Sequence, residues 1–217
     1  MKLLSINVSR PKTVTHLGRP VTTGIFKEQV KGRVMLRQLN LDGDEQADLT
    51  VHGGVDQAVY VYSSDHYDYW QRELKRDTFA FGQFGENFIV QGMSEDAVCI
   101  GDVFRVGDAV VEVTQPRVPC FKLAMKMGLP DFPKRFMASG RSGFYLRVLQ
   151  EGKVGAGDTF DRIKADPARL SVRDALRLRF FDKDNLELIR VAANIPGLSD
   201  AWRVKFMKRL QQPNGSN

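Results

Sequence analysis

The chain has 217 residues, of which 42% are hydrophobic and 27% are charged, ordinary fractions for a globular protein with one sizeable domain. No apolar run approaches the length of a membrane span, and the polar start of the chain does not fit a signal peptide. Two cysteines exclude a disulfide framework and a four-cysteine iron–sulfur cluster, so we expect reduced thiols, a cytoplasmic protein and no membrane partner.

The positive charge is concentrated near the C-terminal end. The net charge is +6, and the residues from 164 onward hold eleven Lys and Arg against six Asp and Glu. A +5 segment is usually the solvated face of helices, so we do not expect a nucleic-acid partner. A basic face also suits an acidic redox protein, and this alternative stays open.

The first half of the chain has the pattern of short strands joined by turns. Alternating apolar residues predict a first strand, and the proline- and glycine-containing segment 9–23 predicts a loop. A helix is expected from about 64 to 75, because Tyr67, Trp70 and Leu74 recur at helical spacing. Further strands are predicted at 34–41, 58–62, 98–100, 103–106, 110–114 and 144–149, and short helices at 121–127 and 131–139.

The last quarter of the chain has helical periodicity. Capping-box patterns begin at Ser171 and Asp184, and Ser199 can cap a third helix. The fold class is therefore mixed α+β and β-rich. We expect a β-barrel with inserted short helices in residues 1–163, followed by a three-helix domain with a frayed tail in residues 164–217.

Cys120 lies in a stiff, positively charged connection between a strand and a helix. Pro116 and Pro119 prevent the strand from continuing, and helical spacing begins after Cys120. Arg117 and the nearby helix N-terminus favour the thiolate, which is the form that binds soft metals. The alternative is a small buried hydrophobe, which is our interpretation of Cys99.

Asp48 and His52 precede a pair of glycines, Gly53 and Gly54. A carboxylate and an imidazole beside a backbone without Cβ atoms are suited to close contact with a ligand. The alternative is a turn in which Asp48 satisfies backbone donors and His52 is partly buried beside it. Both interpretations stay open from the residues alone.

Two other groups of side chains could line a pocket. Glu86 and Asn87 follow a glycine- and aromatic-rich stretch that either borders a pocket or turns a corner between strands. Lys27, Arg117 and Arg141 can bind a phosphate or another oxyanion, although each is also typical of a solvated surface charge.

Four segments occur in an order that is specific. They are TGIFK at 23–27, DLTVHGGVDQAV at 48–59, GQFGEN at 82–87 and PRVPC at 116–120. Together they resemble the MOSC-domain family, in its YiiM-like bacterial branch, and the basic three-helix tail is similar to the helical domain that ends proteins of that branch. Gln57 departs from the pattern, in which a lysine is expected.

The resemblance implies a β-barrel that binds the molybdenum cofactor, a pterin dithiolene that carries molybdenum and a phosphate. Cys120 falls on the position expected to give the metal its thiolate ligand, and His52 is our candidate proton donor. The residues expected to bind the cofactor are Lys27, Asp48, Gly53, Gly54, Glu86, Asn87, Arg117 and Arg141.

The activity implied by the resemblance is the reduction of small N-hydroxylated compounds, such as hydroxylaminopurine base analogues, as a detoxification reaction. Electrons are expected from a separate reductase, because the sequence has no flavin, haem or iron–sulfur motif. The alternative is a carrier of molybdenum cofactor or sulfur without redox turnover. Binding of pyridoxal phosphate is not expected, and a homodimer stays open.

Overall fold

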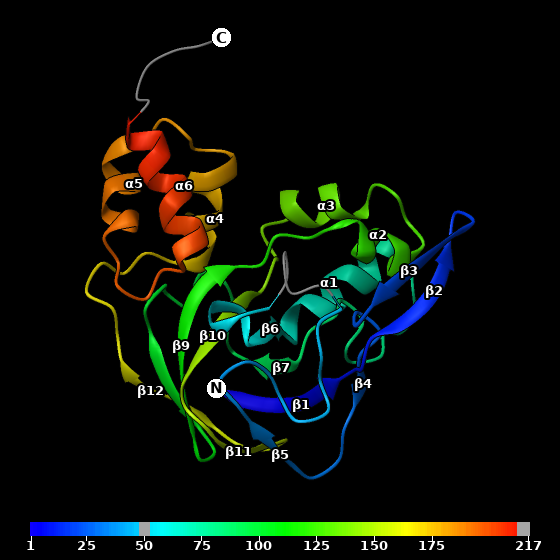
Figure 1. Ribbon diagram of the computed structural model, residues 1–217. Helices are drawn as coiled ribbons and strands as arrows, with labels where there is room; N and C mark the ends of the chain where they lie inside the picture. Colours follow the sequence, from blue (N-terminus) through cyan, green and yellow to red (C-terminus); the bar gives the residue numbers. More distant parts are fainter. Residues whose placement is uncertain (48–52, 212–217) are drawn as a thin grey trace.

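An eight-stranded mixed sheet forms the body of the protein (Figure 1), and the computed structural model describes residues 1–47 and 53–211. The strand order is β12-β8-β9-β10-β6-β7-β1-β4. These strands are β1 (Lys2–Val8), β4 (Glu28–Gln29), β6 (Val59–Ser63), β7 (Phe88–Gln91), β8 (Val103–Val106), β9 (Ala109–Pro116), β10 (Phe144–Gln150) and β12 (Phe160–Lys164). Two smaller sheets pair β2 (Lys12–His16) with β3 (Arg19–Thr23), and β5 (Arg33–Leu36) with β11 (Gly152–Gly155).

The predicted closed barrel is not formed. In the part of the chain that the structure describes, no ladder joins the end strands β12 and β4, so the large sheet is open. The sheet curls instead, and a single bridge between Lys2 and Thr159 brings β1 to the segment before β12. Register shifts, such as that between Leu3 and Ser5 in β1, allow strong local bending, but closure needs a continuous ladder.

One pair of neighbouring strands in the sheet is parallel. β6 and β7 run side by side with Val61 opposite Phe88, whereas the other ladders are antiparallel. Helix α1 (Asp65–Leu74) forms part of the connection, as parallel strands require. The helix predicted at this place is confirmed, and it buries Tyr67 and Trp70.

The loop predicted at 9–23 is wrong. β2 and β3 form a hairpin that projects from the body (Figure 1), and it turns at Leu17 and Gly18. Both turn residues have positive φ angles, 49° and 74°, which match the twist of a two-residue hairpin turn. The prolines on which the prediction rested stand before β2 and on an exposed position of β3, where they remove no essential ladder bond.

The predicted helices are present. α2 (Phe121–Met127) and α3 (Phe132–Ala138) accompany α1 on one side of the sheet, and α4 (Val172–Phe180), α5 (Leu186–Ala193) and α6 (Asp200–Gln211) form a group beside β9 (Figure 1). Ser171 caps α4, because its hydroxyl accepts a hydrogen bond from the backbone N–H of Asp174 at 3.0 Å. The cap predicted at Asp184 is shifted by one residue, to Asn185, whose side chain accepts from Leu188 N–H.

Two groups of buried side chains hold these elements together. The larger one is shared between the sheet and the C-terminal helices, and it includes Val111 and Val113 of β9 with Leu176 and Trp202. The smaller one is largely aromatic and lies beneath α1, α2 and α3. Its largest fully buried members are Tyr62, Trp70, Phe84, Phe132 and Phe136.

Cys99 lies in the core, as predicted, with 3% of its surface exposed. The strand predicted around it is reduced to an isolated bridge between Cys99 and Ser171. Burial and Asp102 raise the pKa of this thiol, which therefore stays protonated near neutral pH.

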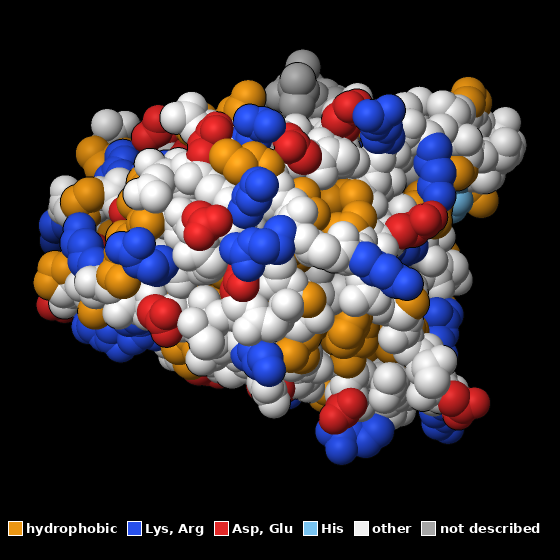
Figure 2. Space-filling model, turned by 90° about the horizontal axis from the view of Figure 1, so that it is seen from below, with side chains coloured by type: hydrophobic (Ala, Val, Ile, Leu, Met, Phe, Trp, Pro, Cys, Tyr) orange, Lys and Arg blue, Asp and Glu red, His pale blue; other side chains and the backbone are white. Residues whose placement is uncertain are grey.

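The surface carries charges of both signs. On the underside of the molecule, Lys and Arg gather toward the side of the C-terminal helices, while acidic and basic side chains alternate elsewhere (Figure 2). None of the helices in the described ranges is long and apolar enough to span a membrane.

Candidate functional site

A cavity of about 110 Å³ collects residues from all four sequence motifs. Lys27, Gly53, Asn87 and Cys120 border it, although they lie far apart in the sequence. The cavity is lined by the end of β3, the start of β6, the segment before β7 and the connection from β9 to α2. The sequence motifs therefore meet in space at one site.

Cys120 is placed by the connection that the sequence predicted. β9 ends at Pro116, and Cys120 is the N-cap residue of α2 with an extended backbone, φ −118° and ψ 176°. The backbone N–H of Arg117 donates to the oxygen of Gly143 at 3.0 Å, which fixes the connection to the start of β10. Cys120 is partly exposed and faces the cavity, in contrast to the buried Cys99.

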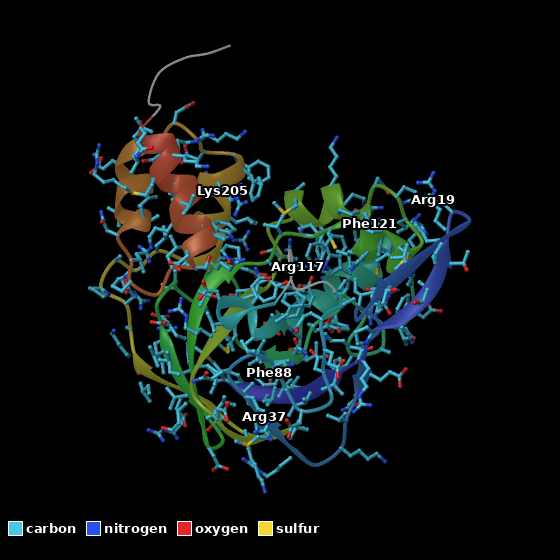
Figure 3. All side chains as sticks on the ribbon, in the orientation of Figure 1. Arg19, Arg37, Phe88, Arg117, Phe121 and Lys205 are labelled. Carbon is cyan, nitrogen blue, oxygen red and sulfur yellow. The ribbon has the colours of Figure 1, made fainter. Side chains whose placement is uncertain are left out.

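Arg117 is a buried cation at the same cavity (Figure 3). Only 5% of its surface is exposed, and its guanidinium lies over the rings of Tyr60 and Phe136 at 5.1 and 5.3 Å. Among the described residues, no carboxylate forms an ion pair with it and its Nη1 has no hydrogen-bond partner. Because a buried charge is normally paired, this arrangement favours an anionic ligand.

Tyr60 and Tyr145 form an aromatic wall of the cavity. Their ring centroids are 5.5 Å apart, and the hydroxyl of Tyr60 donates to the oxygen of Ser142 at 2.9 Å. Burial is the main reason that the pKa values of both phenols are raised, so both remain neutral. The wall offers flat apolar surfaces next to the charge of Arg117.

Lys27 lines the cavity, but its ammonium group is already paired. Nζ lies 2.5 Å from Oδ1 of Asp44, and Oδ2 of Asp44 accepts from Nδ2 of Asn87 at 2.8 Å. Burial lowers the pKa of Lys27, while the pair with Asp44 opposes that shift. Lys27 and Asn87 therefore form a buried polar network at the cavity, and Asp44 holds it together.

Glu86 and Arg141 do not line the cavity. Glu86 is fully buried and accepts hydrogen bonds from Tyr67 and from the backbone N–H groups of Gly82 and Phe84, so it shapes its own loop. Burial raises its pKa, and the hydrogen bonds from Tyr67 and from the Gly82 N–H oppose the shift. Arg141 lies with its guanidinium 3.8 Å from the ring centroid of Tyr69.

Asp48 and His52 lie outside the described residues. The two glycines that follow have φ angles of 90° and 84°, which only glycine adopts readily. A Cβ on Gly53 would come within 3.2 Å of the Gln46 side chain, whereas Gly54 faces open space. Gly53 thus brings bare backbone to the cavity.

Sequence reasoning missed three residues of the site. Tyr60 and Tyr145 meet because β6 and β10 pair in a register that puts them opposite each other, and no local pattern reveals that register. Asp44 stands in an acidic, turn-rich segment but is only 2% exposed. Its ion-pair partner Lys27 lies 17 residues away in the sequence, and no local pattern links the two.

Comparisons with known proteins agree with this geometry. Residues 48–161 match the family model for the MOSC domain, and residues 170–212 match the model for the YiiM-like, 3-alpha helix domain. The protein YflK of Bacillus subtilis is 43% identical over 207 residues, which cover 95% of this chain and 93% of YflK.

Two further relatives extend the comparison. The crystal structure of YiiM from Geobacillus stearothermophilus superposes with a TM-score of 0.82 at 38% identity, covering 96% of this chain and 98% of that one. A protein of Gibberella moniliformis named Reductase is 36% identical over 197 residues, which cover 89% of this chain but 35% of that protein. The chain thus belongs to the MOSC-domain family and ends in a YiiM-like three-helix domain.

Proposed function

We propose that the cavity binds the molybdenum cofactor and that the protein reduces small N-hydroxylated compounds. The observation that carries this proposal is the buried Arg117, which lines the cavity together with Cys120 and whose Nη1 has no hydrogen-bond partner among the described residues. MOSC domains are often associated with this cofactor, whose phosphate and metal need an anion-binding group and a soft donor.

The residues at the cavity fit the three parts of this group. Arg117 offers a desolvated guanidinium to a phosphate, for which arginine is well suited. Cys120 offers a thiolate, a soft ligand that matches a transition metal. The bare backbone of Gly53 and the rings of Tyr60 and Tyr145 line the same cavity and present flat surfaces suited to a heterocycle.

Each protein group then has a definite task. When bound, the cofactor supplies the two-electron chemistry needed to cleave an N–O bond. Arg117 holds the anionic end and Cys120 fixes the position of the metal. The phenols of Tyr60 and Tyr145 stay neutral and exclude water, while Lys27 remains in its pair with Asp44. His52 is our proposed proton donor.

The reductase activity and the electron donor are also proposals. A relative named Reductase supports the activity, and most of that fungal protein lies outside the segment that this chain matches. We propose that in the present protein a separate reductase delivers the electrons.

The test is a metal analysis followed by an activity assay. Protein purified from cells that make the cofactor should contain molybdenum and should reduce 6-hydroxylaminopurine with dithionite-reduced viologen as the donor. Absence of turnover at full molybdenum occupancy would refute the reductase proposal. Additional sulfur on Cys120 without molybdenum, seen by mass spectrometry, would favour the carrier function instead.

A further inference from the structure

The wall of the cavity formed by residues 53–57 has little hydrophobic support. Gly53 and Gln57 border the cavity, and the 3-10 helix η1 (Val55–Gln57) lies between the first of them and β6. No residue of η1 is buried, and Val55 is 52% exposed. Because this segment does not insert an apolar side chain into the core, polar contacts must fix its position.

Asp56 provides these contacts on several sides. Its Oδ1 accepts from Nε and Nη2 of Arg147 at 2.9 and 2.5 Å, and its backbone oxygen accepts from the hydroxyl of Thr114 at 2.6 Å. Its Oδ2 accepts from the backbone N–H of Asp200 at 3.2 Å. Asp56 thereby joins η1 to β9, β10 and the first residue of α6.

The partners of Asp56 are themselves held in place. Nη1 of Arg147 donates to Oε2 of Glu112 at 2.9 Å, so this arginine lies between two carboxylates. The backbone N–H of Ser199, just before α6, donates to the oxygen of Thr114 at 3.2 Å. The carboxylate of Asp56 also lies at the N-terminal end of α6, where the exposed N–H groups favour a negative charge.

We infer that Asp56 is a positioning residue through which the three-helix region holds one wall of the cavity. The carboxylate does not border the cavity, but its neighbour Gln57 does. A shift of α6 would therefore move Asp56 and, with it, the backbone from Gly53 to Gln57. The functional part of this inference rests on the proposed function, because it assumes that the cavity holds the molybdenum cofactor.

The test compares Asp56→Ala with two matched controls. Asp42→Ala removes a carboxylate bound to Arg37 at an exposed surface, with the Nε–Oδ1 distance at 2.6 Å. Leu210→Ala loosens the far end of α6, which packs on the main core, without touching Asp56. Each variant is measured for molybdenum content, for amide hydrogen exchange at residues 53–57 and for melting temperature.

Asp56→Ala should speed exchange at Gln57, whose N–H donates to the oxygen of Gly54 at 3.0 Å. It should also bind the cofactor about 10-fold more weakly, seen as a lower molybdenum content. Neither control should do so, even where Leu210→Ala lowers the melting temperature more. Unchanged exchange and cofactor retention in Asp56→Ala, or an equal loss in Leu210→Ala, would overturn the inference.

The two proposals can fail separately in this experiment. If the wild-type protein holds no molybdenum, the proposed function is refuted, while faster exchange in Asp56→Ala would still support the positioning role. If the wild-type protein holds molybdenum but Asp56→Ala keeps normal exchange and retention, only the positioning role is refuted.

Discussion

Replacing Arg117 with methionine should separate binding from stability. The change removes the buried charge and keeps an unbranched side chain of similar reach. Two cation–π contacts, at 5.1 and 5.3 Å, are lost, at about 1 kcal/mol each. Relief of the unpartnered Nη1 returns about 1–3 kcal/mol, and the charge no longer has to be buried.

The free energy of unfolding of the ligand-free protein should therefore change by less than about 1 kcal/mol, from losses and gains that nearly cancel. Binding of the cofactor should suffer much more, because a charge-assisted hydrogen bond contributes about 1.5–3 kcal/mol, or about 10- to 150-fold in affinity. Urea unfolding of the ligand-free protein and molybdenum content after purification measure the two effects.

Arg37→Met is the matched control, because Arg37 is exposed and paired with Asp42. This variant should keep its molybdenum. A loss of more than about 3 kcal/mol in ligand-free Arg117→Met, with the cofactor retained, would show that Arg117 is structural and would refute the reasoning.

Three further outcomes are expected. Cys120→Ser should lose molybdenum and reductase activity, whereas Cys99→Ser should lose only thermal stability. Metal analysis and calorimetry measure the two effects, and the reverse result would identify Cys99 as the metal ligand. Burial lowers the pKa of Lys126 to about 8, so only the unfolded chain keeps that proton at higher pH. The free energy of unfolding in urea, measured relative to Lys126→Met, should therefore rise by up to about 2 kcal/mol from pH 8 to about 9.5. A difference between the two proteins that does not change with pH would contradict this. Ser171→Ala should lower the free energy of unfolding by about 1 kcal/mol in the same assay, because it removes the cap of α4. An unchanged value would show that this cap does not stabilise the protein.

The features that the sequence predicted well are those determined by residues close together in the chain. The connection around Cys120 was predictable because two prolines and the onset of helical spacing fix its backbone without help from the rest of the fold. The helix α1 and the cap at Ser171 were predictable for the same reason. In each case the residues that decide the structure lie within a few positions of one another.

The features missed depend on pairing between distant segments. The aromatic wall needs Tyr60 opposite Tyr145, and the hairpin of β2 and β3 was hidden because prolines and a glycine suggested a loop. Closure of the sheet depends on contacts between its end strands, which neither the pattern of short strands nor the family resemblance specified. Glu86 matched a motif, yet only the tertiary structure shows that its carboxylate faces its own loop.

The core shared by the sheet and the C-terminal helices has a consequence during synthesis. Val111 and Val113 on β9 share one buried core with side chains of the C-terminal helices such as Trp202, which leaves the ribosome some ninety residues later. Until then the nascent sheet exposes an apolar face that can associate with other chains. The last helices thus complete the core that buries this face, and stop codons before α6 should yield aggregated protein rather than a smaller folded one.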